Sequence, residues 1–451
     1  MSRVPEGQHQ TSRQVSGLAG QARRLAGRAR RLGVTARRQI GERVRQRVRT
    51  VRSRQAALQP GEVARAGAFR HGYLVSAAGS SVPPAVAQWV RREVGTVTYR
   101  LHPSTRLTVA ADAIVLLGDP VDVDADTADT AMIAQRLAGL RPDGTAAIVR
   151  AASRLGGRWT LFVHESDGRL TVVTDALASQ GVWWDQEDVI ASHRALLSTP
   201  VSALQPNTLL RVGLPGRDDH EVHCYWPAPE GSGADLVVEP GAAGRELRER
   251  LVTHTRLLAT LGRPGLALTE GVASRALLAA YLRHPRDDGF AFTTFEVSSV
   301  GEGLGPVEHL FAASHLAQTV GLPHRVLEVA ATPEAEPLAV AFSQTYPEGA
   351  SHPQSASAGV ARAYSALPEG TVVLHPAGAE VQDQATWEAG DHLRSSEGFP
   401  EGDLTQRVLL PFNDRRVIEL LLSLSGARED ASAPLAPLVD ELPTPTPALD
   451  A

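Results

Sequence analysis

Apolar and polar residues alternate along the first half of the chain, which is the pattern of half-buried strands. Residues 159–164 and 169–174 alternate in this way, and Ser166-Asp167-Gly168 between them predicts the turn of a β-hairpin. The segment "AIVLLGDPV" predicts a buried strand, "TADTAMIAQRLAGL" a helix and "GVWWDQEDVIASH" a further strand pair. We therefore expect residues 61–235 to form an α+β domain whose helices lie outside its sheets.

The pattern changes after residue 236 to strands that alternate with helices. The predicted strands are "GLALT", "FAFTTFEV", "HRVLEV" and "TVVLH", and the predicted helices span 243–261, 274–283, 306–321 and 357–367. This alternation over residues 236–429 predicts a doubly wound parallel sheet. Ligands of such sheets bind at the carboxyl ends of strands, where the turns after "GLALT" and "TVVLH" lie. Residues 430–451, rich in Pro, Ala and acids, are expected to be a loose tail.

Residues 1–60 differ from the rest of the chain. Arginines are interleaved there with apolar residues at helical spacing: Leu18, Leu25, Leu32, then Ile40, Val44, Val48 and Val51. Residues 1–55 carry a net charge of +13 and the remainder −18. The segment is thus a basic arm, either a solvated, partly helical tail or an amphipathic helix on anionic lipid or polymer. Nucleic acid is not expected, because no aromatic residue interleaves with the arginines.

Composition narrows the class of protein. The chain has 451 residues, room for two or three domains, 43% hydrophobic residues and a mean hydropathy of −0.13. No apolar run approaches the roughly 20 residues of a membrane span, and the basic N-terminus has no apolar signal core. One cysteine, Cys224, fits a reducing compartment. We expect a cytoplasmic protein that contacts membranes, if at all, peripherally through the arm.

Five segments together resemble the asparagine synthetase family, which includes the β-lactam synthetases and lasso peptide cyclases. They span about residues 65–425 in the family's order: "GGRWTLFVHESDGRLTVVTDALASQGVWW", "CYWPAP", "LTEGVASR", "LHPAGAEVQDQ" and "PFNDRRVIELLLSL". The resemblance implies an N-terminal glutaminase-like (Ntn-type) β-sandwich domain, followed by a doubly wound ATP-pyrophosphatase-like domain. It also implies that "LTEGVASR" occupies the position of the pyrophosphate loop, Ser-Gly-Gly-x-Asp-Ser, and "LHPAGAE" that of a second ligand loop.

The departures from the family motifs fall on the chemistry. Thr269, Gly271 and Ser274 match the loop, but Glu270 replaces its first glycine and Ala273 its magnesium-holding aspartate. In the second loop, Gly378 keeps the loop small. Glu380 stands where the family motif has an aspartate, and Val381 replaces the acidic residue that follows it in the motif. All 45 basic residues are arginine, so the family's catalytic lysine cannot exist here. The N-terminal nucleophilic cysteine is missing too.

Other polar clusters are weaker candidates for chemistry. His220, His223 and Cys224 suit no common zinc spacing, and alternation on a strand explains them. "DVDADTAD" lacks the glycine and glutamate of a calcium loop. His309 and His315 are expected on a helix surface. We therefore predict no metal site among these residues.

Two functions follow from this pattern. The first is an asparagine synthetase-like homologue that is catalytically impaired, takes no cofactor, and binds or regulates a protein partner or biosynthetic enzyme. The second is an active ATP-dependent, AMP-forming amide ligase, with Arg275 neutralising Glu270, and Glu380 with Asp383 holding magnesium. The ligand loops in both are formed by Thr269, Glu270, Gly271, Ser274, Gly378 and Glu380; a cleft for a cation or amine beside Glu270 remains a third possibility.

The basic arm generates a direct prediction. Deletion of residues 1–60 should leave the rest of the protein folded, because the few apolar residues of the arm cannot build a core. The full chain should bind vesicles containing phosphatidylserine, with affinity that falls as salt rises, and the deletion should abolish binding in a vesicle sedimentation assay. Equal sedimentation of both proteins would exclude the arm as the membrane contact.

Overall fold

The computed structural model describes residues 67–80, 82–198, 200–213, 217–226, 240–296, 305–330, 332–333, 336–347, 354–381, 387–388, 398–425 and 433–443. The predicted basic arm lies outside these residues. All the described residues belong to the unit that begins at Pro60. Within them, every helix is too short or too polar to cross a lipid bilayer.

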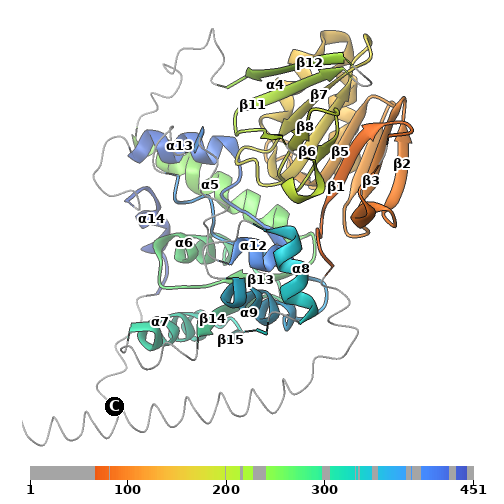
Figure 1. Ribbon diagram of the computed structural model, residues 1–451. Helices are drawn as coiled ribbons and strands as arrows, with labels where there is room; N and C mark the ends of the chain where they lie inside the picture. Colours follow the sequence, from red (N-terminus) through yellow and green to blue (C-terminus); the bar gives the residue numbers. More distant parts are fainter. Residues whose placement is uncertain are drawn as a thin grey trace, which may run out of the picture. The chain divides into compact units, whose positions relative to one another are not determined.

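Two six-stranded antiparallel sheets occupy the first part of this unit (Figure 1). The strand orders are β10-β8-β9-β1-β3-β2 and β12-β11-β7-β6-β5-β4. The predicted hairpin is confirmed: β6 and β7 pair antiparallel from Thr160↔Thr174 to His164↔Leu170. The bounds are β1 (Tyr73–Ala77), β2 (Val90–Val94), β3 (Val97–Leu101), β4 (Leu107–Ala110), β5 (Ile114–Val121), β6 (Gly156–His164), β7 (Arg169–Thr174), β8 (Trp183–Asp185), β9 (Ile190–Ala191), β10 (Val201–Ala203), β11 (Thr208–Gly213) and β12 (Arg217–Cys224).

The two antiparallel sheets share one apolar core. Tyr73 and Tyr99 of one sheet pack with Phe162, Val172 and Leu210 of the other, so the sheets face each other. Helices α3 (Thr130–Gly139) and α4 (Thr145–Ala152) cover the outer face of the second sheet. The carboxylate of Asp129 caps α3 by accepting from the backbone N–H groups of Ala131 and Met132. We refer to residues 67–226 as the sandwich.

A five-stranded parallel sheet forms the second part, in the order β15-β14-β13-β16-β17. Helices lie on both faces, which confirms the predicted double winding. The elements are α5 (Pro240–Ala259), β13 (Arg263–Ala267), α6 (Val272–Tyr281), β14 (Phe290–Glu296), α7 (Gly305–Thr319), β15 (His324–Val329), α8 (Pro337–Thr345), α9 (Gln354–Ser365), β16 (Thr371–Leu374), α12 (Phe399–Asp403), β17 (Arg407–Leu409), α13 (Arg415–Ser425) and α14 (Ala436–Val439). We refer to residues 240–443 as the parallel-sheet body.

The segment "PFNDRR" joins the sandwich to the parallel-sheet body. Asn413, with no exposed surface, donates to Gly157 O (2.8 Å) and to Asp175 Oδ1 (2.9 Å). Its own side-chain oxygen accepts from the backbone N–H of Leu177 (3.1 Å). One amide of the parallel-sheet body therefore hydrogen-bonds to several buried polar groups of the sandwich.

The next two residues of this segment add charge to the same contact. Asp414, also without exposed surface, accepts from Arg250 Nε on α5 (2.7 Å). Arg415 donates to Asn207 and to the hydroxyl of Tyr225 (2.9 Å). Helices α5 and α13 consequently pack side by side next to the sandwich (Figure 1). The sequence resemblance singled out this motif, and its observed role is to join two halves of the fold.

Two further ion pairs cross the same boundary. Arg158 on β6 and Asp403 at the end of α12 form a bidentate pair, with Nη1 to Oδ1 at 2.5 Å and Nη2 to Oδ2 at 3.2 Å. Arg407 on β17 binds Asp119 on β5 through Nε at 2.6 Å. All four side chains are largely buried. Removal of one partner of such a pair typically costs about 3–5 kcal/mol.

Part of the expected C-terminal tail is packed in the core. Residues 433–443 include α14, and Leu435, Leu438, Val439 and Leu442 are buried against α6 and its neighbours. Apolar side chains at this spacing on a short helix bury one face, whereas the Pro and Ala content of the segment suggested a loose tail. The remaining residues of that predicted tail, 430–432 and 444–451, lie outside the described part of the chain.

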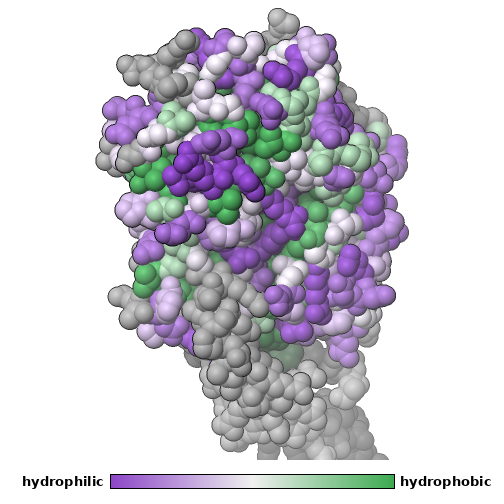
Figure 2. Space-filling model, turned by 90° about the vertical axis from the view of Figure 1, so that its right-hand side faces the viewer, coloured by the Kyte–Doolittle hydropathy of each residue, from purple (hydrophilic) through white to green (hydrophobic). Residues whose placement is uncertain are grey.

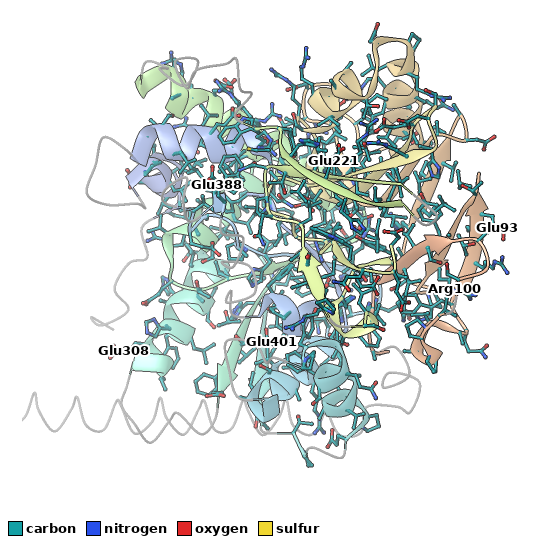
Figure 3. All side chains as sticks on the ribbon, turned by 45° about the horizontal axis from the view of Figure 1, so that its top comes forward. Glu93, Arg100, Glu221, Glu308, Glu388 and Glu401 are labelled. Carbon is teal, nitrogen blue, oxygen red and sulfur yellow. The ribbon has the colours of Figure 1, made fainter. Side chains whose placement is uncertain are left out.

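The exposed hydrophobic side chains of the described residues are scattered and form no single apolar face. Hydrophilic and hydrophobic residues are interspersed on the side shown in Figure 2. The large hydrophobic side chains that the described residues expose lie on six different elements: Val90, Val109, Met132, Val222, Phe311 and Val340. Among the acidic residues, Glu401 in α12 has no exposed surface, whereas Glu93 and Glu308 lie at the periphery (Figure 3).

Candidate functional site

The two predicted ligand loops follow neighbouring parallel strands. Strands β13 and β16 pair in the register Leu266↔Leu374, and the loops begin directly after them. From β13 the chain runs outward to β15 and then returns to β16 on the other side. The gap between β13 and β16 is therefore the topological switch point, where doubly wound sheets bind ligands. We call the space between the two loops the crevice.

The first loop is held by its own hydroxyl groups. Ser274 Oγ donates to Thr269 O (2.9 Å) and accepts from the backbone N–H of Thr269 (3.1 Å). Thr269 Oγ1 accepts from the N–H of Gly271 (3.1 Å) and lies 3.0 Å from Ser274 Oγ. The two loop hydroxyls that the resemblance assigned to ligand binding thus bind the loop itself.

Glu270 is exposed at the tip of this loop and has a partner on another helix. Its Oε1 lies 2.5 Å from Nδ1 of His309 on α7. Both side chains are about half exposed, at 51% and 53%. Arg275, which the sequence suggested as the neutralising residue, makes no ion pair with Glu270 in the described part of the chain. Arg275 was expected as a nearby arginine in the sequence, whereas the observed partner comes from α7.

The second loop also contains a carboxylate bonded to its own backbone. Glu380 Oε2 accepts from the N–H of Gly378 at 2.8 Å. Gly378 has φ +96°, and a Cβ there would lie 2.6 Å from Leu177 Cδ1 of the sandwich. Only glycine fits this position, because both the backbone conformation and the contact exclude a side chain. The loop conformation therefore depends on the contact between the sandwich and the parallel-sheet body, which we call the joint.

The start of α6 remains open to an anion. Arg275 N is the first amide of the helix with an intrahelical acceptor, Gly271 O, and Gly271 provides no side-chain cap. The preceding amides of Val272, Ala273 and Ser274 have no acceptor in the described part of the chain. Such N–H groups favour negative charge. No group of three or more His, Cys, Asp or Glu among the described residues is arranged to hold a metal ion, and Asp383 lies outside them.

The other candidate sites named from the sequence are structural. His223 and Cys224 lie on β12, as alternation predicted, and His220 of the same strand pairs with Asp188 at 2.7 Å. The carboxylate of Asp122, in the segment considered for calcium, pairs with Arg136. These side chains are thus committed to contacts within the sandwich.

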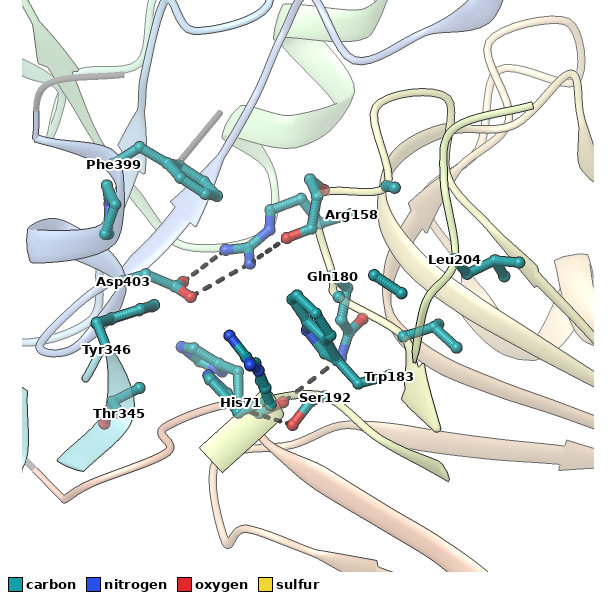
Figure 4. Close-up of a pocket in the computed structure, with 18 of the residues that line it drawn as sticks. His71, Arg158, Gln180, Trp183, Ser192, Leu204, Thr345, Tyr346, Phe399 and Asp403 are labelled. Carbon is teal, nitrogen blue, oxygen red and sulfur yellow. Dashed lines mark hydrogen bonds and ion pairs between the residues drawn. The ribbon is translucent and has the colours of Figure 1, made fainter. Parts of the chain in front are cut away.

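A separate cavity of about 170 Å³ lies where the sandwich meets the parallel-sheet body (Figure 4). The sandwich contributes residues before β1, Arg158 on β6 and residues around β8–β10. The body contributes residues at the end of α8 and on α12. Three aromatic rings (Trp183, Tyr346 and Phe399) and two imidazoles (His71 and His193) line it. It is distinct from the crevice, because no residue of the 269–274 or 376–380 loops borders it.

Helix α12 positions the charged wall of this cavity. Buried Glu401 accepts from the N–H of Gly398 (3.1 Å) and from Ser357 Oγ (2.8 Å), which fixes the short helix. Asp403 at its end then meets Arg158, whose guanidinium also lies 4.9 Å from the ring centre of Phe399. Burial alone would raise the pKa of Asp403, but the charge of Arg158 holds it below its usual value.

The histidines of the cavity are neutral at pH 7. Burial lowers the pKa of His193 to about 4, against a smaller opposing effect of Asp403. Burial also lowers the pKa of His71 and lowers that of the neighbouring His102 to about 4. Perturbed titratable groups around one cavity are a mark of functional sites.

Little in the sequence pattern indicates this second site. Its residues are scattered from His71 to Asp403 along the sequence. Only "GVWWDQEDVIASH", which contains Trp183 and His193, was noted, and for its strands alone. The comparisons add no relative: the chain matches no protein-family model and no curated protein.

The cavity histidines predict acid destabilisation. Their pKa values are lower in the folded state than in the unfolded state, so the unfolded chain binds more protons below pH 6.5. Stability is therefore complete above about pH 6.5 and falls as the pH approaches 4. Between pH 6.5 and 4.5, the His193→Gln variant should lose about 1–3 kcal/mol less of its free energy of unfolding than the unmodified protein does, as measured by urea unfolding. His284→Gln, at an exposed position, is the control for loss of an imidazole. If the unmodified protein and both variants lose the same stability between pH 6.5 and 4.5, His193 is not the source of the acid destabilisation.

Proposed function

We propose that the chain is an asparagine synthetase-like protein that has lost ATP chemistry and acts by binding, as a regulatory or scaffolding partner of another enzyme. In this proposal the sandwich is a glutaminase-like domain and the parallel-sheet body an ATP-pyrophosphatase-like domain. The support is the order of an antiparallel sandwich and a doubly wound sheet, with the motif residues at the switch point. The absence of lysine from the sequence supports the absence of ligase activity.

The observation that carries the proposal is the pair of carboxylates in the crevice. Glu380 already occupies an amide of the second loop, and Glu270 stands at the tip of the first. A carboxylate about 4 Å from a phosphate oxygen costs on the order of 4 kcal/mol at an effective dielectric constant of 20. Ala273 supplies no side-chain oxygen for magnesium, so the metal that normally accompanies ATP loses a ligand.

One observation favours the alternative, an active amide ligase. The open amides at the start of α6 are the groups that hold phosphate in strand–turn–helix sites. In that case Glu270 would have to turn away from the ligand, and its contact with His309 shows one direction available to it. Binding of Mg-ATP therefore separates the two functions.

We predict that the unmodified protein shows no magnesium-dependent stabilisation by ATP. A ligand at 100 times its Kd raises stability by roughly 2.7 kcal/mol, which a thermal shift assay detects. The double variant Glu270→Gly with Ala273→Asp should gain magnesium-dependent stabilisation, because it removes the repelling carboxylate and restores a metal ligand. It should still form no amide, since no lysine is present.

The single variants are the matched controls. Glu270→Gly alone should bind ATP weakly without dependence on magnesium. His309→Ala should leave the loop unchanged but remove the side chain that contacts Glu270. Micromolar binding of Mg-ATP by the unmodified protein, with release of pyrophosphate when carboxylate substrates are supplied, would overturn the proposal and establish the ligase.

A further inference from the structure

The cavity beside Arg158 and Asp403 has the size of a site for one aromatic ring. Its volume is about 170 Å³. An apolar cavity of roughly 150 Å³ accommodates benzene in another protein. A ring that enters here meets Trp183, Tyr346 and Phe399 from different sides of the lining (Figure 4). Aromatic rings gain from edge and offset contacts with one another beyond the area they bury.

The charges around the cavity favour an uncharged ligand. Arg158 and Asp403 neutralise each other, and His71 and His193 carry no charge at pH 7 because burial lowers their pKa values. The other charged side chains of the lining, Arg70 and Arg194, already take part in interactions within the chain. A charged ligand would consequently lose its hydration without gaining an uncommitted counter-ion.

The lining contains polar groups without a hydrogen-bond partner in the described part of the chain, Gln180 Oε1 among them. The hydroxyl of Tyr346 makes no hydrogen bond with any described residue. His193 bonds through Nδ1 to Ser192 Oγ (2.7 Å), while its Nε2 has no partner in the described part of the chain. The two rings lie 6.0 Å apart between centroids. These groups are suited to bind a hydroxyl or ring nitrogen on the edge of a ligand.

We propose that this cavity binds an uncharged molecule with one aromatic ring and a hydrogen-bonding edge, such as a phenol. Rings of the lining hold its faces, and Tyr346 with His193 binds its polar edge. Because the lining comes from both the sandwich and the parallel-sheet body, the ligand strengthens their joint. This inference goes beyond the proposed function, since the crevice and the cavity share no residue and each can bind or fail to bind independently of the other.

Three probes of one ring size test this inference on the full-length protein. Phenol is uncharged and has a polar edge, benzoate is charged, and toluene has no polar edge. We expect phenol to bind with a Kd on the order of 1 mM or tighter by isothermal titration calorimetry, and to raise the melting temperature. Toluene should bind more weakly. The inference would be overturned if phenol at about 10 mM gave neither binding heat nor a change in melting temperature. It would also be overturned if benzoate bound more tightly than phenol.

Variants localise the binding. Tyr346→Phe should weaken the binding of phenol about fivefold and leave the binding of toluene unchanged, because the substitution removes one hydrogen-bonding group and keeps the ring. Ala203→Phe, on the lining, should abolish binding of both by filling the cavity. Val222→Phe adds the same side chain at a position 49% exposed and outside the lining, and should bind as the unmodified protein does. Unchanged phenol binding in both Tyr346→Phe and Ala203→Phe would place the ligand elsewhere and contradict the inference.

Discussion

The buried polar contact between the sandwich and the parallel-sheet body is the constraint on which the other features depend. Asn413 bonds to groups of β6 and of the turn after β7, while Arg158 and Asp403 pair across the boundary with little exposed surface. Buried groups of this kind are costly unless every partner is present. The sandwich and the parallel-sheet body are therefore held in one arrangement, because separating them would break these hydrogen bonds and ion pairs.

Both candidate sites inherit their geometry from this contact. Gly378 of the second crevice loop packs on Leu177 of the sandwich, so the loop conformation requires the joint to be closed. The cavity has its walls on either side of the joint and exists only when the two parts meet. If the crevice has lost its phosphate chemistry, "PFNDRR" would still be retained, because that segment holds the joint rather than a nucleotide.

The sequence predicted those features of the fold that the local pattern of apolar and polar residues determines. Apolar alternation predicted the β6–β7 hairpin and the strand–helix succession, and the position of the two loops after adjacent strands followed from double winding. It did not predict contacts made across the fold. The partner of Glu270 is His309 rather than Arg275, the segment 433–443 is buried, and the cavity combines His71, Tyr346 and Asp403 from distant segments. These depend on tertiary packing, which neither periodicity nor spacing encodes.

The central claim is that the polar joint makes sandwich and parallel-sheet body one cooperative unit. Native-state hydrogen exchange of the full-length protein at increasing urea tests it most directly. Slowly exchanging amides of β6 in the sandwich and of β13 in the parallel sheet should show the same free energy of opening and the same dependence on urea. Two distinct free energies, with one part opening while the other stays protected, would contradict the claim.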